Sequence, residues 1–191
     1  AGFSSVCGLL DDGSVNCWGW NSDNQAGVRA GPYTHVTAGN RFACGLLTDG
    51  SLDCWGSDQN VVQTEMPTEP GFLAIDIADF HPCALDSTGE VVCWGTYGSV
   101  LNNFHGAEGG STLNGPYVGI SNGWNSLCAW DADGAVACEG ADSSTNTVPA
   151  ETFQFVEVGL ESACGITDSN DVVCWGSEDG SHLVSNTPFR T

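Results

Sequence analysis

CGLLDDGSVNCWG, residues 7–19, is one of five similar stretches in this sequence of 191 residues. The other four are CGLLTDGSLDCWG from Cys44, CALDSTGEVVCWG from Cys83, CAWDADGAVACEG from Cys128 and CGITDSNDVVCWG from Cys164. Each copy places two cysteines ten positions apart around a turn signal, and a glycine lies two residues after the second cysteine. Recurrence at steps of 37, 39, 45 and 36 residues indicates a repeat protein.

A β-hairpin with a three-residue loop fits the first copy. If Leu10 and Ser14 close the hairpin, residues 11–13 form a type I turn plus bulge, whose third residue has positive φ. That third position holds glycine in four copies and Asn170 in the fifth, and asparagine is the best replacement for glycine there. The turn chemistry therefore predicts the same hairpin in every repeat.

In this register Cys7 lies opposite Cys17, and Leu9 lies opposite Val15. Directly opposed residues in a non-hydrogen-bonded pair have Cα atoms about 4.5 Å apart, at the short end of the disulfide range. We therefore expect one disulfide in each hairpin and no unpaired cysteine. The predicted pairs are Cys7–Cys17, Cys44–Cys54, Cys83–Cys93, Cys128–Cys138 and Cys164–Cys174.

Metal binding is the alternative use for these cysteines. Structural zinc sites draw on ligand pairs separated by roughly two to four residues, and the sequence contains no CxxC or HxxxH. We therefore expect no metal site. Five disulfides also indicate an oxidising compartment, so the sequence predicts a secreted, surface-displayed or periplasmic protein.

The charge of the chain narrows the choice of partner. Lys and Arg total 3 against 24 Asp and Glu, which gives a formal net charge of −21. Such a surface repels phosphate backbones and anionic lipids, so we expect no nucleic-acid partner and no membrane-surface binding. The charge suits either solubility alone or attraction of cations or a basic partner. No apolar run approaches about 18 residues, so we expect no membrane insertion.

The two ends of the chain carry complementary parts of one repeat. Residues 1–2 (AG) align with residues 38–39 (AG). Residues 188–191 (PFRT) align with residues 32–35 (PYTH). A ring in which the ends meet removes exposed sheet edges, whereas a linear solenoid needs capping repeats. We therefore expect residues 1–191 to form a single domain, a five-bladed β-propeller closed through its terminal segments.

The rest of each repeat indicates an all-β body. Turn signals recur at short intervals, helical periodicity is absent, and the 26 glycines disfavour long helices. A short strand is expected before each of the later hairpins, at residues 35–38, 75–78, 117–120 and 153–158.

This pattern resembles the regulator of chromosome condensation repeat. The resemblance is carried by Ala-Gly, then CGLLxDGSVxCWG, then NxxNQAG, and it is fullest over residues 1–27. Cysteine-paired versions are similar to those of bacterial extracellular proteins, and the short repeat resembles the propeller-type β-lactamase inhibitory protein. The familiar family propellers have seven blades rather than five. In addition, Glu139 replaces tryptophan in the fourth unit, which should leave one blade junction less apolar.

The resemblance implies a protein-interaction role. The nuclear member is a nucleotide-exchange factor that binds histones, and a nuclear role does not suit an acidic, disulfide-bonded chain. The inhibitory member covers an enzyme with one face of its ring, which suits this chain better. Fold alone does not settle function, so candidate residues have to be judged one by one.

Tryptophans at a repeated position are expected to be structural. One slot beside each disulfide holds Trp18, Trp55, Trp94 and Trp175. Repetition at one slot is what packing between blades requires, and a ring of aromatic sugar-binding platforms is the alternative.

Unrepeated aromatic residues are the expected binding anchors, because packing symmetry does not explain them. They are Trp20, Tyr97, Phe104 and Trp124. The longest step between repeats includes residues 97–116, and a loop of that length is either functional or disordered. It carries Phe104 next to His105, so we include His105 among the candidate binding residues.

Catalytic motifs are absent from the sequence. The four histidines share no ligand-like spacing, and there is no GxSxG, HExxH or phosphate loop. We therefore expect no catalytic residue and no cofactor, and a hydrolase with a chance pair of carboxylates is the weakest alternative. Calcium is a minor alternative, because Asp131, Asp133 and residues 168–171 are rich in oxygen, although no complete DxDxDG loop is present.

The loops after the repeated tryptophans favour one asymmetric contact. They read WNSDNQAG, SDQNVVQ, TYGSVLN, ADSSTNT and SEDGSHL and share almost nothing. The sequence therefore predicts an extracellular module for adhesion, assembly or inhibition that binds another protein, a cell-surface component or a further copy of itself. A lectin is the alternative, and it would need aromatic and polar loop residues repeated in register.

Overall fold

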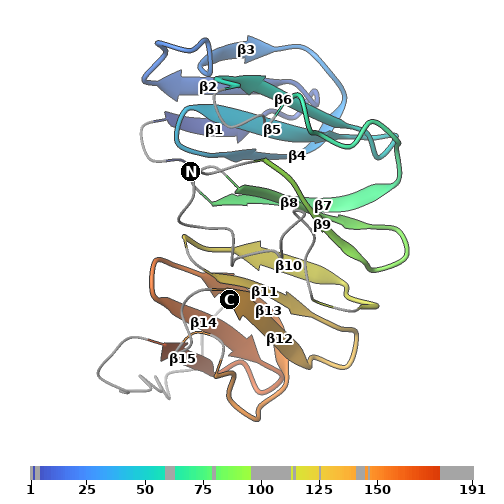
Figure 1. The fold of residues 1–191 in the computed structure, drawn as a ribbon, viewed down its shortest axis with the longest axis vertical. Helices are drawn as coiled ribbons and strands as arrows, with labels where there is room; N and C mark the ends of the chain where they lie inside the picture. The colour runs from blue at the N-terminus through green and yellow to red at the C-terminus, as the bar shows by residue number, and fades with distance from the viewer. Residues whose placement is uncertain are drawn as a thin grey trace. The chain divides into compact units, whose positions relative to one another are not determined.

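The computed structural model describes residues 2, 5–58, 63–78, 81–95, 113, 115–124, 126–140, 145 and 147–176. These residues form fifteen β-strands in five three-stranded antiparallel sheets (Figure 1). The described part of the chain contains no helix, and hence none that is long and apolar enough to cross a membrane. Residues 97–112 of the long loop and residues 188–191, on which the predicted ring closure depends, lie outside it.

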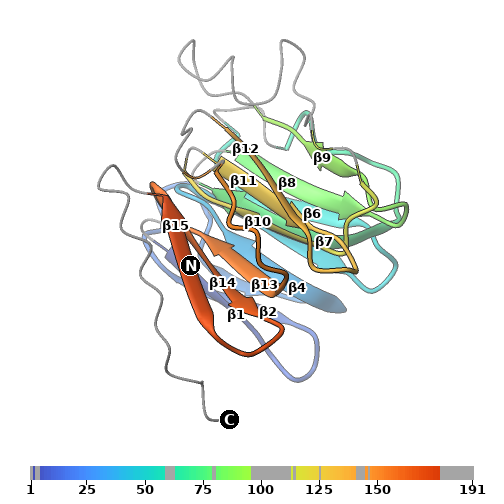
Figure 2. The same ribbon diagram turned by 90° about the horizontal axis from the view of Figure 1, so that it is seen from below.

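Each sheet is one repeat, and its strands follow one another in sequence order. The first two sheets are β1 (Ser5–Leu9), β2 (Val15–Gly19) and β3 (Gly27–Arg29), then β4 (Tyr33–Ala38), β5 (Phe42–Leu47) and β6 (Leu52–Gly56). The third is β7 (Phe72–Ala78), β8 (His81–Asp86) and β9 (Val91–Cys93). The last two are β10 (Gly119–Asn122), β11 (Ser126–Trp130) and β12 (Val136–Gly140), then β13 (Phe153–Val158), β14 (Ser162–Thr167) and β15 (Val172–Gly176) (Figure 2).

The chain divides into two compact units. The first consists of Ala1–Ser87 with Val92–Val100, and the second of Thr88–Val91 with Leu101–Thr191. The first two sheets lie wholly in the first unit, and the last two lie wholly in the second.

The hairpin register predicted from the sequence is confirmed. Cys7 pairs with Cys17 and Leu9 with Val15, and the Leu10 backbone N–H donates to the Ser14 carbonyl at 2.8 Å. The third loop residue has positive φ in all five hairpins, at Gly13 (81°), Gly50 (83°), Gly89 (85°), Gly134 (81°) and Asn170 (64°).

All five predicted disulfides form. The Cα atoms of the paired cysteines lie 4.0 or 4.1 Å apart, slightly closer than expected for opposed residues, and no cysteine is free. Each disulfide therefore lies within one hairpin, and none links two repeats.

The strands that precede the hairpins differ from the predicted ranges. β4 and β7 begin earlier than expected, because a bulge after Tyr33 and another after Phe72 keep these aromatic residues paired with the next strand. Tyr33, Phe72 and the equivalent Phe153 expose only 6%, 9% and 1% of their surfaces. β10 is shifted by two residues toward the C-terminus of the predicted range, whereas β13 matches its prediction.

The core of each unit joins the tryptophan of one repeat to the disulfide of the preceding repeat. In the first unit, Trp55 packs in one cluster with Cys17, and Trp94 packs in another with Cys44. In the second unit, Trp175 packs with Cys128. Packing between successive sheets thus explains why the tryptophan and the cysteines recur together.

Candidate functional site

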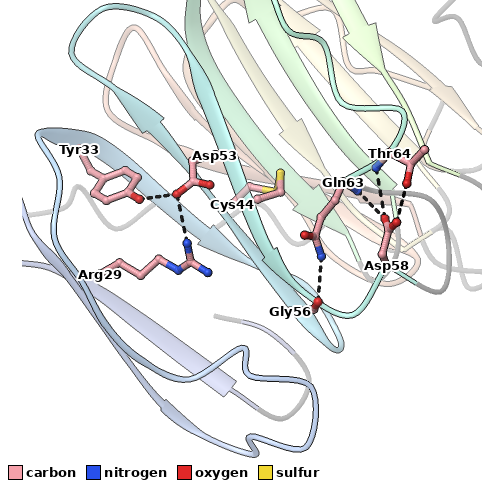
Figure 3. Close-up of a disulfide and its surroundings, with 9 residues drawn as sticks. Arg29, Tyr33, Cys44, Asp53, Gly56, Asp58, Gln63 and Thr64 are labelled. Atoms are coloured by element: carbon pink, nitrogen blue, oxygen red, sulfur yellow. Dashed lines mark hydrogen bonds and ion pairs between the residues drawn. A yellow bond between two sulfur atoms is a disulfide. The ribbon is translucent and has the colours of Figure 1, made fainter.

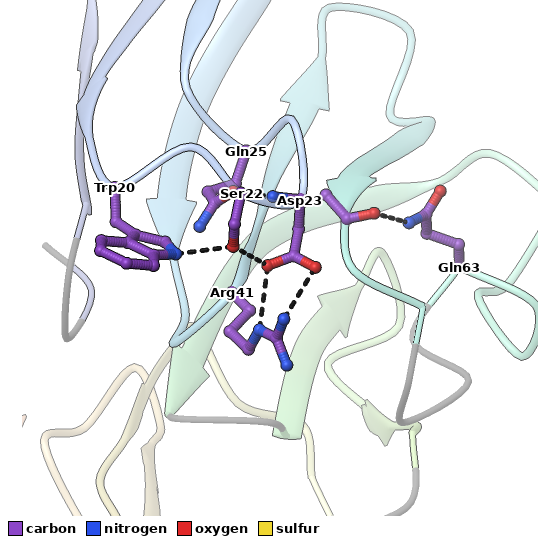
Figure 4. A network of polar contacts seen from close by, with 7 residues as sticks. Trp20, Ser22, Asp23, Gln25, Arg41 and Gln63 are labelled. Carbon is purple, nitrogen blue, oxygen red and sulfur yellow. Dashed lines mark hydrogen bonds and ion pairs between the residues drawn. The ribbon is translucent and has the colours of Figure 1, made fainter.

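Trp20 follows β2 directly and is strongly exposed. It exposes 61% of its surface, and its indole Nε1–H donates to the Ser22 hydroxyl at 2.6 Å. The Ser22 hydroxyl in turn donates to the Asp23 carboxylate at 2.7 Å (Figure 4). The polar edge of the indole is therefore occupied by the protein, and the apolar remainder of the ring is available to a partner.

Asp23 ties this loop to the neighbouring sheet. The Arg41 guanidinium, which lies just before β5, donates from Nε and Nη2 to the two Asp23 oxygens at 2.9 Å each. The hydrogen bonds from Ser22 and Arg41 hold the pKa of Asp23 below its usual value. The Asp23 backbone N–H donates to the side chain of Gln25, which is fully buried. A bidentate ion pair and a buried amide thus fix the loop that carries Trp20.

Trp18 does not follow the other repeated tryptophans. Trp55, Trp94 and Trp175 expose 2%, 6% and 1% of their surfaces, as the packing prediction requires, whereas Trp18 exposes 55%. Tyr33 covers Trp55, with ring centroids 6.1 Å apart, and Phe153 covers Trp175 at 5.3 Å. Among the described residues, no aromatic side chain covers Trp18 in this way. The prediction that Trp18 packs between sheets is therefore wrong for the part of the chain described.

A second polar cluster in the first unit surrounds Trp55. The Tyr33 hydroxyl donates to the Asp53 carboxylate at 2.5 Å, and Arg29 pairs with the same carboxylate at 3.5 Å (Figure 3). The Arg29 guanidinium also lies 4.6 Å from the centre of the Trp55 ring. Burial and the hydrogen bond to Asp53 raise the pKa of Tyr33 to about 12. Each of these groups already has a partner within the protein. Because Arg29 lies on β3 and the other groups lie on β4 and β6, the cluster joins the first sheet to the second.

Trp124, the predicted binding residue of the second unit, lies in the loop between β10 and β11 and exposes 41% of its surface. Its backbone N–H donates to the Gly159 carbonyl at 3.3 Å, in the loop between β13 and β14. The next residue, Leu160, exposes 58%. Sequence reasoning missed Leu160, although it and Trp124 both lie four residues before the first cysteine of their repeats. That shared position was the available signal.

The acidic turns use their carboxylates locally. Asp12, Asp49 and Asp131 each accept a hydrogen bond at 2.9 Å from the backbone N–H two residues further on. Contacts with Ser14 and Ser51 hold the pKa values of Asp12 and Asp49 below the usual range. These aspartates therefore act as turn residues.

A shallow groove of about 510 Å³ lies beside the last hairpin turn. Its lining includes Glu151, Thr152, Asp168 and Asp171. Thr152 donates from its hydroxyl to the Asp168 carboxylate at 2.6 Å. Among the described residues, no group of three His, Cys, Asp or Glu side chains is placed to hold a metal ion.

Only part of the predicted set of binding residues can be located. Trp20 and Trp124 are exposed, but they belong to different units. Tyr97, Phe104 and His105 lie outside the described residues, so their role stays a prediction.

Two segments of the chain match a known repeat family. Residues 1–25 and 33–60 match the model of the regulator of chromosome condensation (RCC1) repeat. These segments contain the first two hairpins, including Trp20 and Arg41.

Solved structures share the fold. The CRINKLY WD40 ectodomain of the Arabidopsis thaliana receptor kinase ACR4 matches with a TM-score of 0.76 and 26% identity, over 96% of this chain and 65% of that chain. The ectodomain of the Physcomitrella patens receptor kinase CR4 matches with a TM-score of 0.75 and 24% identity, over 93% and 49%. Prp20p from Saccharomyces cerevisiae, characterised for its binding to Gsp1p and histones, matches with a TM-score of 0.68 and 15% identity, over 91% and 56%. The chain thus spans 49% to 65% of the length of these structures.

Proposed function

We propose that this chain, a repeat protein of the regulator of chromosome condensation type whose sheets are β-propeller blades, is an extracellular, non-enzymatic protein-interaction module. It binds its partner through unrepeated loops, and Trp20 is an anchor of that contact. The observation that carries the proposal is the state of Trp20. Its ring is 61% exposed, yet its indole N–H is held by Ser22 and its loop by the Asp23–Arg41 ion pair.

A fixed, exposed indole is well suited to binding. Immobilising a side chain on association costs roughly 0.5–1.5 kcal/mol, and part of that cost is already met when the ring is held in the free protein. Tryptophan is also among the residue types that most often dominate interface energies. The hydrogen-bonded chain from Trp20 to Arg41 therefore gives the first unit a preorganised anchor.

The extracellular location is supported by the cysteines. Five disulfides persist in an oxidising compartment, and the likeness to two receptor-kinase ectodomains agrees with this. A partner protein or cell-surface component is supported by the loops, which vary between repeats, and by Prp20p, a protein of this fold that has been characterised for binding other proteins.

The test is photo-cross-linking followed by affinity measurement. A photoreactive amino acid placed at Ser57, whose backbone N–H bonds to the Arg41 carbonyl, leaves the anchor intact and captures what docks beside it. Affinity for the captured protein is then measured with Trp20→Ala, with Ser22→Ala and with Leu73→Ala as the control. Leu73 is a matched exposed apolar residue, with 63% of its surface exposed.

Loss of the anchor should weaken binding by about 30-fold, the equivalent of about 2 kcal/mol, without lowering the melting temperature. Ser22→Ala should cause a smaller loss, because it frees the ring without removing it, and Leu73→Ala should cause none. Equal affinities for Trp20→Ala and the unmodified chain would refute the role of Trp20. Binding on a glycan array that is abolished by Trp20→Ala would instead establish a lectin.

A further inference from the structure

Two loops of the second unit are joined into one surface. The loop between β10 and β11 contains Gly123, where an added Cβ would lie 2.3 Å from the Gly159 carbonyl oxygen and 2.5 Å from a Val158 methyl group. No side chain fits at such distances, so glycine at position 123 allows the two loops to touch directly. Trp124 and Leu160 are the residues that follow these two glycines, and they expose 41% and 58% of their surfaces, so the contact brings together two loops that each carry an exposed apolar residue.

Backbone hydrogen bonds hold the base of this surface. Each loop is closed by a backbone hydrogen bond of 2.7 Å, from Gly123 to Ser126 in one and from Gly159 to Ser162 in the other. Beneath them, the backbone N–H of Val158 donates to the buried hydroxyl of Ser121 at 3.0 Å. The exposed side chains therefore stand on backbone that is already ordered, which lowers the entropic cost of binding.

The charge around Trp124 and Leu160 favours a cationic partner. Glu161 follows Leu160 directly and is exposed, and the described residues of the second unit include no Lys or Arg. A surface of one sign attracts the opposite sign, and the face of an indole binds guanidinium or ammonium groups. An apolar patch in an acidic setting thus fits a ligand that is both apolar and cationic.

We infer that Trp124 and Leu160 form a docking surface for a basic protein segment, in which an apolar side chain lies between Lys or Arg residues. The apolar side chain covers Leu160, and a neighbouring cation lies on the exposed Trp124 ring near Glu161. This surface lies in the second unit, and the inference does not depend on Trp20.

The test follows the indole N–H signals of the ¹⁵N-labelled full chain by nuclear magnetic resonance, with the Trp124 signal assigned by Trp124→Phe. The probes are two capped peptides of equal length, Arg-Leu-Arg-Leu-Arg and Glu-Leu-Glu-Leu-Glu. The arginine peptide should shift the Trp124 signal in a saturable way, and its affinity should fall several-fold as the salt concentration is raised. The glutamate peptide should leave the signal unchanged.

Two variants make the result specific. Leu160→Ser should weaken the arginine peptide about tenfold or more. Leu73→Ser, at an exposed leucine of the first unit, should bind it as the unmodified chain does. Equal binding of both peptides, unchanged binding by Leu160→Ser, or no saturable shift at Trp124 would each overturn the inference. A shift at Trp20 alone would also overturn it while leaving the proposed function standing.

Discussion

The indole Nε1–H of Trp55 donates a hydrogen bond to the backbone carbonyl of Gln25, 3.1 Å away. Trp175 makes the same bond to the carbonyl of Thr145 at 2.9 Å, and both acceptor residues are fully buried. The tail of one repeat is thus fastened to the hairpin of the next through a main-chain atom. Because the acceptor is a carbonyl, the tail residue can change from glutamine to threonine without loss of the contact.

Two different replacements of Trp55 should therefore destabilise the first unit by different amounts. Trp55→Phe keeps an aromatic ring but leaves the Gln25 carbonyl without its donor, which should cost about 1–3 kcal/mol. Trp55→Ala also opens a cavity and should cost about 3–5 kcal/mol. Unfolding in denaturant under oxidising conditions measures both changes. Trp20→Ala is the control and should change the free energy of unfolding by less than about 0.5 kcal/mol, and a comparable loss there would contradict this assignment.

Glycines in two equivalent turns should differ in their tolerance of alanine. Gly13 and Gly50 have φ of 81° and 83°, so alanine at either position pays about 1–2 kcal/mol for the left-handed conformation. At Gly50 the new Cβ would also lie 2.8 Å from the Gly71 nitrogen, whereas at Gly13 the nearest atom, the Pro32 Cα, is 3.3 Å away. Gly50→Ala should therefore lower the melting temperature more than Gly13→Ala. The opposite order would show that the backbone at Gly71 can move away from the new methyl group without a loss of stability.

Removal of a disulfide should cost more in the core than at the last sheet. Cys44 and Cys54 expose 0% and 7% of their surfaces and pack in the apolar cluster that contains Trp94, whereas Cys164 and Cys174 are half-buried. Both pairs close loops of equal length, so the loss of unfolded-state constraint should be the same, about 3 kcal/mol. Replacing both cysteines of each pair by alanine and measuring unfolding in urea should show the larger loss for the 44–54 pair. Equal losses would mean that packing around the bridge contributes little.

Stability should fall in strongly alkaline solution because of Tyr33. Burial and the hydrogen bond to Asp53 raise its pKa from 10.0 to about 12, so the folded state holds the phenolic proton more tightly than the unfolded state does. The stabilisation is complete below pH 10 and is lost as the pH rises toward 12. Tyrosinate absorbance should show a late-titrating group that is missing in Tyr33→Phe. A variant with an unchanged titration curve would contradict the assignment.

The repeated hairpin could be predicted from the sequence because its determinants are local. The ten-residue spacing of Cys7 and Cys17, together with the glycine or asparagine at the third loop position, leaves one register that satisfies both the turn and the bridge. The bulges after Tyr33 and Phe72 were missed, because a bulge depends on how the next strand pairs and carries no fixed residue signature.

The candidate sites depend on contacts between repeats, which a single sequence does not specify. Trp20 stood out because its position is not repeated, but its loop is held by the ion pair of Asp23 with Arg41, which lies 18 positions after Asp23 and just before a strand of another sheet. Trp18 occupies a slot that predicts burial, yet burial there is decided by whether another segment covers the ring. The surface inferred for Trp124 and Leu160 likewise depends on the contact between their loops, where the Trp124 backbone N–H donates to the Gly159 carbonyl.

A cut in the backbone within residues 11–13 would release neither strand, because the Cys7–Cys17 bridge spans the exposed turn. The other four turns are spanned in the same way. A protease acting at these turns would therefore leave one covalent molecule, heavier by one water for each cut, until a reductant separates the pieces. Cleavage at a hairpin turn therefore leaves the two strands of that hairpin covalently joined.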